Sequence, residues 1–99
     1  MLDFYTIKDH LPTSDYPDKL DLKFAGDLDD RTFSQLQSKE IVPRNFDYYS
    51  DFRWDRKTIQ QICNAITDKN LESDTDVKKL MQLLNAAIQA ECSLVAYGD

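Results

Sequence analysis

The chain has 99 residues, of which 41% are hydrophobic and 30% charged, and its formal net charge is −6. These values are typical of one folded domain and exclude an intrinsically disordered chain, so we expect a single domain over residues 1–99. No apolar run reaches the roughly 18 residues that a membrane span needs. The start MLDFYTIKDH lacks the apolar stretch of a secretory signal. The sequence therefore predicts a cytoplasmic protein that does not enter a membrane.

Negative charge is concentrated in the first half of the chain. Residues 1–51 contain eleven Asp and Glu against six Lys and Arg, whereas residues 52–99 contain seven against six. A negative field repels the phosphates of nucleic acids and attracts basic proteins. We therefore expect a basic protein partner and no binding of nucleic acid.

Two candidate strands lie in the N-terminal quarter. One is LDFYTI, residues 2–7, and the other is KLDLKFAG, residues 19–26, where Leu20, Leu22 and Phe24 alternate with charged residues. The segment LPTSDYPD between them is typical of a loop. Because two isolated strands are only marginally stable, we expect them to lie against helices, as a short hairpin if they pair.

A short helix is predicted over residues 29–40. Asp29 can cap it, since a short carboxylate accepts hydrogen bonds from the free N–H groups of a first turn. Phe33 and Leu36 follow at helical spacing, and Pro43 prevents much extension.

A second helix is predicted to begin after Asp55 and to fade near Lys69 and Asn70. Isoleucines and a cysteine repeat on one of its faces. Trp54, just before the cap, and Ile59, in the second turn, have the spacing of a hydrophobic staple.

The last helix is predicted to begin at Ser73 or Asp74 and to end between Cys92 and Tyr97, near Gly98. Its apolar residues recur at intervals of three, four and seven. The short connection at residues 71–73 turns the chain back, which predicts an antiparallel pair of C-terminal helices.

Together these elements predict a mainly α, compact, helix-rich domain; the alternative is an α+β fold with a short N-terminal hairpin. The expected core residues are Phe24, Phe33, Leu36, Phe52, Ile59, Ile62, Ile66, Leu80, Leu84 and Ile88.

No pattern in the sequence predicts catalysis, a metal site or a cofactor. DLDD at 27–30 and DTD at 74–76 resemble the start of calcium loops, but the following positions lack the oxygen ligands and glycine that such loops need. His10 is the only histidine and lies beside no nucleophile motif. Cys63 and Cys92 stand alone, so we expect two small core residues rather than metal ligands or a disulfide.

The stretch FDYYSDFRW, residues 46–54, contains five aromatic rings and has two interpretations. In the first, Phe46, Phe52 and Trp54 pack inward and the tyrosines lie partly exposed. In the second, the stretch is also a partner-binding surface, since large rings beside fixed charges are typical of interface hot spots. The binding residues would then be Asp47, Tyr48, Tyr49 and Asp51, with Asp27, Asp29 and Asp30 adding steering charge.

Two segments, Tyr48 to Trp54 and Leu94 to Asp99, together with the small acidic character of the chain, resemble immunity proteins encoded beside bacterial polymorphic or contact-dependent toxins. The resemblance implies a non-enzymatic inhibitor that binds one cognate toxin domain and covers its active site or an adjacent surface. Many such toxins are nucleases with basic substrate clefts. The alternative is a self-associating adaptor or structural subunit that dimerises through its apolar helix pair.

Overall fold

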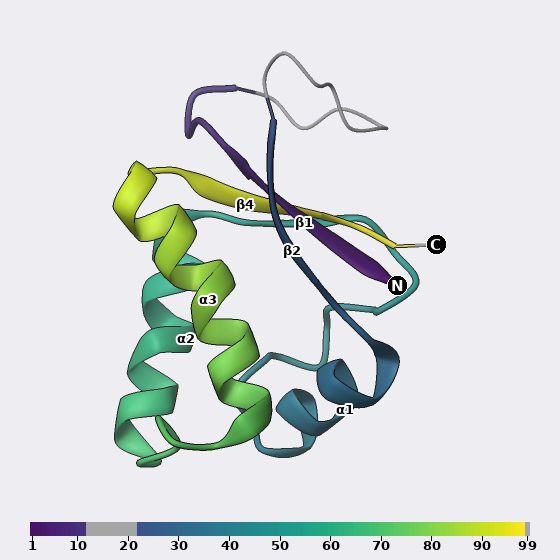
Figure 1. Cartoon of the computed structure of the whole chain (residues 1–99), viewed down its shortest axis with the longest axis vertical. Helices are drawn as coiled ribbons and strands as arrows, with labels where there is room; N and C mark the ends of the chain where they lie inside the picture. Colours follow the sequence, from purple (N-terminus) through teal and green to yellow (C-terminus); the bar gives the residue numbers. More distant parts are fainter. Residues whose placement is uncertain (12–21, 99) are drawn as a thin grey trace.

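The computed structural model describes residues 1–11 and 22–98 of the chain. These residues form a four-stranded antiparallel sheet and three helices (Figure 1). The expectation of a mainly α fold is therefore wrong, and the fold is α+β. The short N-terminal hairpin of the alternative is present, but it forms only half of the sheet.

The sheet has the strand order β2-β1-β4-β3. Its strands are β1 (Leu2–Ile7), β2 (Lys23–Leu28), β3 (Phe52–Trp54) and β4 (Ser93–Tyr97). The first and last strands of the chain are thus its two central strands, and the pairing of Asp3 with Tyr97 brings the chain ends together. The expected strand at 19–26 is confirmed from Lys23 onward, while residues 12–21, including Leu20, lie outside the described residues.

All three expected helix starts are confirmed. The helices are α1 (Asp30–Ser38), α2 (Arg56–Asp68) and α3 (Thr75–Ala90). Their N-caps are Asp29, Asp55 and Asp74, whose carboxylates accept hydrogen bonds of 2.7 to 3.1 Å from N–H groups of the first turn. Each cap satisfies donors that a helix start leaves without an intrahelical partner.

The end of the last helix differs from the prediction. α3 ends at Ala90, and Glu91 turns the chain with a left-handed φ of 54°. After Cys92, the five residues Ser93–Tyr97 form β4, and all of them are buried between β1 and β3. A strand buried on both faces shows no alternation of apolar and polar residues, so its sequence continues the apolar pattern of the helix before it. The turn also lacks the glycine that usually marks a helix end.

Helices α2 and α3 cover one face of the sheet (Figure 1). Leu2 and Phe4 of β1 and Leu94 and Ala96 of β4 belong to the main core beneath these helices. The residues between them in sequence point to the other face, because successive side chains in a strand alternate. There a second, smaller cluster contains Ile7, Val95 and Tyr97.

Most of the expected core is buried. The confirmed residues are Phe33, Leu36, Ile59, Ile62, Ile66, Leu80 and Leu84. Phe52 is half-buried and packs against the same core. Phe24 and Ile88, however, are 55% and 49% exposed, so their assignment to the core was wrong. Phe24 lies on an edge strand that no described strand pairs with on its outer side, and Ile88 lies beyond the buried stripe of α3.

The hairpin of β1 and β2 contains a β-bulge. Phe4 pairs with Gly26 and Tyr5 with Phe24, which leaves Ala25 as an extra residue in β2. Gly26 has a φ of 151°, and a Cβ built there would lie 2.7 Å from Leu83 Cδ2 of α3. The positive φ therefore favours glycine at this position, whereas the methyl of Leu83 lies at the end of a flexible side chain and could shift.

None of the helices in residues 1–11 and 22–98 has the combination of length and hydropathy that a membrane-spanning segment needs.

Candidate functional site

The aromatic side chains of the stretch 46–54 divide between the core and the solvent-exposed surface. Trp54 is fully buried, and Phe46 and Phe52 are half-buried beside it, with ring centroids 5.0 Å apart for Phe46–Phe52 and 5.5 Å for Phe52–Trp54. Tyr48 is also half-buried and its ring lies 5.9 Å from that of Phe33. Four of the five rings therefore belong to the main core or its border.

Tyr49 is the ring that points outward. Its side chain is 63% exposed, compared with 55% for Phe24. Its ring lies edge-on to that of Tyr48 at 5.0 Å, and its hydroxyl donates a 3.4 Å hydrogen bond to Asp30 Oδ2 at the first residue of α1. An exposed ring held by contacts at both its base and its tip presents apolar area at a small cost in side-chain entropy.

Asp47 shapes the loop that carries Tyr49. Its Oδ1 accepts the backbone N–H of Tyr49 at 3.0 Å, and its Oδ2 accepts the hydroxyl of Ser50 at 3.3 Å. This is an Asx turn, in which a side chain replaces a backbone acceptor. Asp47 nevertheless remains exposed. We call the surface formed by Asp30, Asp47 and Tyr49 the Tyr49 surface.

Gly98, which follows β4, holds this loop in place. Gly98 donates its N–H to Asp51 Oδ1 at 3.0 Å. A Cβ on Gly98 would lie 2.7 Å from the carbonyl oxygen of Tyr48 and 2.9 Å from the N of Ser50. Only a residue without a side chain fits between these backbone atoms, so Gly98 fixes the position of the loop. Asp51 is thus a support for the loop as well as an exposed carboxylate.

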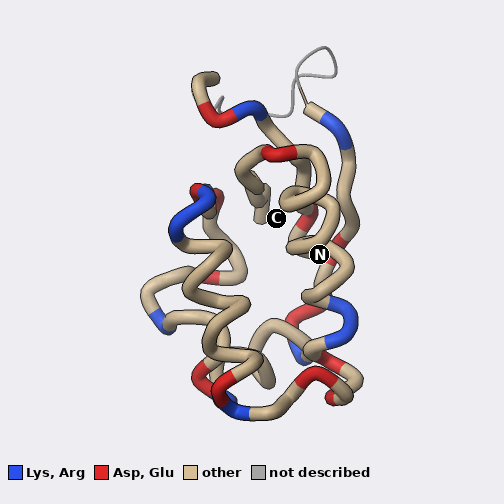
Figure 2. The backbone as a smooth tube through the Cα atoms, turned by 90° about the vertical axis from the view of Figure 1, so that its left-hand side faces the viewer, with Lys and Arg blue, Asp and Glu red and all other residues tan. Residues whose placement is uncertain are grey.

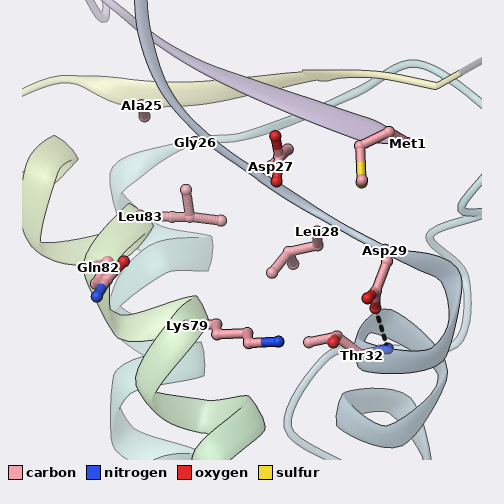
Figure 3. Close-up of a pocket in the computed structure, with 10 residues that line it drawn as sticks. All are labelled: Met1, Ala25, Gly26, Asp27, Leu28, Asp29, Thr32, Lys79, Gln82 and Leu83. Atoms are coloured by element: carbon pink, nitrogen blue, oxygen red, sulfur yellow. Dashed lines mark hydrogen bonds between the residues drawn. The ribbon is translucent and has the colours of Figure 1, made fainter.

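The remaining predicted residues, Asp27 and Asp29, lie beside a hollow of about 330 Å³ between β2, α1 and α3 (Figure 3). Asp29 faces Thr32, and the hydrogen bonds from Thr32 hold the pKa of Asp29 below its usual value. Lys79 of α3 extends across the hollow toward α1 and also lowers the pKa of Asp29. Asp29 is therefore mainly a helix cap whose charge is partly balanced.

The predicted residues thus divide into two adjacent groups. Asp30, Asp47, Tyr48, Tyr49 and Asp51 meet through the contacts of one loop with α1 and the C-terminal end. Asp27 and Asp29 lie around the neighbouring hollow. Elsewhere acidic and basic residues are interleaved along the backbone (Figure 2).

Sequence reasoning missed the residues that hold this surface in place. Gly98 was interpreted only as a helix stop, and β3 is three residues long, too short to show a strand pattern. The pairing of β3 with β4 joins parts of two segments that were singled out in the sequence, Tyr48 to Trp54 and Leu94 to Asp99. Asp99 itself lies outside the described residues. The aromatic run at 46–54 marked the loop, but nothing in the sequence signalled its contact with Gly98, which is distant along the chain.

The other candidates from the sequence lie apart from this surface. His10 is exposed in the turn after β1. Cys63 and Cys92 are free and half-buried, and burial raises the pKa of the Cys63 thiol. Within residues 1–11 and 22–98, no three His, Cys, Asp or Glu side chains are grouped closely enough to hold a metal ion.

Comparison of the chain with protein-family models, with curated proteins and with solved structures gives no match.

Proposed function

We propose that the chain is a non-enzymatic inhibitor that binds one basic protein in the bacterial cytoplasm, in the manner of an immunity protein that neutralises its cognate toxin. The observation that carries this proposal is the exposure of Tyr49, 63%, on a loop held between Asp30 and Gly98. A ring exposed to this extent is a suitable anchor for a partner when its position is fixed before binding.

The charges around Tyr49 determine what kind of partner fits. Asp30 and Asp47 are both exposed and place carboxylates beside the ring. A Lys or Arg of the partner can bind either carboxylate while its apolar part packs on the ring. The net charge of −6 speeds association with a basic surface. A toxin that binds phosphates, such as a nuclease, offers such a surface in its substrate cleft.

The alternative function, a self-associating adaptor or structural subunit, draws support from a different observation. Ile88 is 49% exposed on α3 and could contribute to a contact between copies. The other apolar residues on the inner faces of α2 and α3 are buried against the sheet. This leaves a smaller apolar surface for self-association than the helix pair alone suggests.

Retention of a partner from native cell extract tests the proposal. The chain is immobilised, extract is applied at low and at high salt, and the retained proteins are identified by mass spectrometry. We expect one basic protein that is held at low salt and released at high salt. That protein is then expressed in cells with and without the chain, and we expect it to arrest growth only when the chain is absent.

Two charge variants serve as a matched pair in this experiment. Asp47→Lys reverses a charge on the Tyr49 surface, whereas Asp68→Lys reverses an exposed charge at the end of α2. We expect the first to lose both retention and protection and the second to keep them. Equal behaviour of the two variants, or recovery of the chain alone, would contradict the proposal.

A further inference from the structure

A second surface, separate from the Tyr49 surface, lies along the free edge of the sheet. β2 is an edge strand, and no described strand pairs with its outer side. Two hollows follow this strand. The first, of about 330 Å³, lies beside Gly26 to Asp29, and the second, of about 340 Å³, lies beside Lys23 and Phe24. Ala25 lines both, so the two hollows are neighbours along the strand.

The opposite wall of both hollows is α3. The first hollow is lined by Lys79, Gln82 and Leu83, and the second by Ala86, Gln89 and Ala90. These residues follow each other at intervals of three and four, so they form one stripe along the helix. Figure 3 shows the first hollow between this stripe and β2, with Leu83 directed toward Gly26. We call the two hollows together the β2–α3 groove.

The chemistry of the groove indicates an extended peptide. An edge strand offers a row of backbone donors and acceptors, which another strand can pair with. The helix wall adds neutral amides, Gln82 and Gln89, and small side chains, Ala86 and Ala90, which leave room for side chains of the occupant. Charged side chains lie toward the two ends, at Lys23 and at Asp27, Asp29 and Lys79, so the middle of the groove suits an uncharged peptide backbone.

The dimensions of the groove also fit a strand. β2 has six residues, which span about 20 Å at the usual rise of a strand. Side chains at alternate positions of an added strand face the same side, roughly 7 Å apart. The hollows differ in their linings, so we expect the occupant to place a small apolar side chain beside Ala86 and a polar one beside Asp27 and Lys79.

We propose that the β2–α3 groove binds an extended segment of a partner protein, which adds to the sheet as a strand next to β2. A second copy of this chain is a poorer occupant, because each copy carries a net charge of −6 and two copies repel each other.

The test uses random seven-residue peptides displayed on phage, selected on the immobilised full chain. Synthetic copies of the enriched peptides are titrated into the ¹⁵N-labelled protein. We expect the amide shifts to change in β2 and along the groove side of α3, and not around Tyr49. An N-methyl scan of the peptide should weaken binding only at residues whose N–H groups face β2, and the bulge at Ala25 should interrupt the alternation of these residues.

Two arginine variants of α3 provide the matched control. Ala86→Arg places a long side chain in the second hollow, whereas Asn85→Arg adds the same side chain to an exposed position that does not line the groove. We expect Ala86→Arg to weaken the peptide by at least about tenfold and Asn85→Arg by less than about twofold. Unchanged circular dichroism of both variants shows that they fold.

Three results would overturn the proposal. They are a selection that enriches no binding peptide, equal effects of the two arginine variants or of N-methylation at all positions, and a concentration-dependent dimer whose β2 amides are protected from hydrogen exchange. The last result would assign the groove to a second copy. The proposal does not depend on the inhibitor function, because its readout uses neither the toxin nor the Tyr49 surface.

Discussion

The two ends of α1 use carboxylates in opposite ways. At its C-terminal end, Lys39 Nζ lies 2.7 Å from Asp74 Oδ2 and 3.4 Å from Asp76 Oδ2, so a cation within the chain satisfies both acids at the start of α3. At its N-terminal end, Asp30 accepts hydrogen bonds from the hydroxyls of Ser34 and Tyr49, which are neutral, and residues 1–11 and 22–98 show no ion pair to it. Carboxylates of the first kind stabilise the fold, whereas those of the second kind keep their charge available for a partner.

A substitution at the support of the Tyr49 surface should have the largest effect on stability. In Gly98→Ala the added Cβ meets backbone atoms of Tyr48 and Ser50, which cannot move as a flexible side chain would. We expect the free energy of unfolding to fall by about 1–3 kcal/mol, as measured by urea denaturation. As a control, Ser50→Ala removes the hydroxyl bond to Asp47 without adding atoms, and it should cost less than about 0.5 kcal/mol. A Gly98→Ala protein as stable as the wild type would show that the C-terminal end does not hold the loop.

The internally paired end of α1 should be the next most sensitive. Asp74→Ala removes the N-cap of α3 and the acceptor of Lys39. We expect a loss of about 1–2 kcal/mol in the same measurement. If Asp30→Ala is as costly as Asp74→Ala, the distinction between the two ends is wrong.

The pH dependence of stability should reveal the contribution of the pair formed by Lys39 and Asp74. The hydrogen bond from Lys39 holds the pKa of Asp74 below 3.8, and the bond to Asp74 raises the pKa of Lys39 above 10.5. A carboxylate with a lowered pKa stabilises the fold above its unfolded value, and this stabilisation is lost as the pH falls through the folded value. For a lysine with a raised pKa, the stabilisation is present below 10.5 and is lost as the pH rises through the folded value.

We therefore expect the difference in stability between the wild type and Lys39→Met to be constant across neutral pH. The difference should shrink in acid below pH 3.8, as Asp74 takes up a proton. Urea denaturation at a series of pH values measures it. A difference that does not change in acid would mean that Lys39 acts through packing of its methylene groups and not through its charge.

The smallest effect on stability should come from the outward-facing end. Asp30→Asn keeps a polar side chain of the same shape. Its one oxygen can still accept from either Ser34 or Tyr49, and its NH2 can donate to the hydroxyl oxygen of the other. We expect a change within about 0.5 kcal/mol. The same variant should weaken binding of a basic partner. A large loss of stability would show that Asp30 stabilises the fold, as Asp74 does, and would contradict its assignment to the binding surface.

The helices could be predicted from the sequence because their signals are local. Asp29, Asp55 and Asp74 stand just before apolar residues at helical spacing, and each proved to be an N-cap. The strands β3 and β4 could not be predicted in this way. Their stability comes from pairing with each other and with β1, which is distant in sequence. Tertiary contacts therefore overrode the helical pattern that continues past Ala90.

The candidate site could be predicted in part for the same reason. The mixture of rings and aspartates at 46–54 predicted an exposed ring in this loop, and Tyr49 is 63% exposed. The approach of Gly98 and the bond from Tyr49 to Asp30 join residues far apart in the chain, and no spacing along the sequence shows them. The same holds for the aspartates. Asp74 and Asp76 stabilise the fold because Lys39, distant in sequence, lies beside them, and the sequence does not show this contact.

The central claim is that the Tyr49 surface binds the partner. It is tested most directly by the dissociation constant of the retained basic protein for the wild type, Tyr49→Ala and Ile88→Ala, measured by calorimetry. Ile88→Ala serves as the control, because Ile88 is an apolar residue on α3, away from the loop, whose side chain is 49% exposed. We expect Tyr49→Ala to weaken binding by about 30-fold or more, the effect of losing a hot-spot residue, and Ile88→Ala to change it less than about twofold. Full affinity of Tyr49→Ala together with weakened binding or self-association of Ile88→Ala would contradict the account.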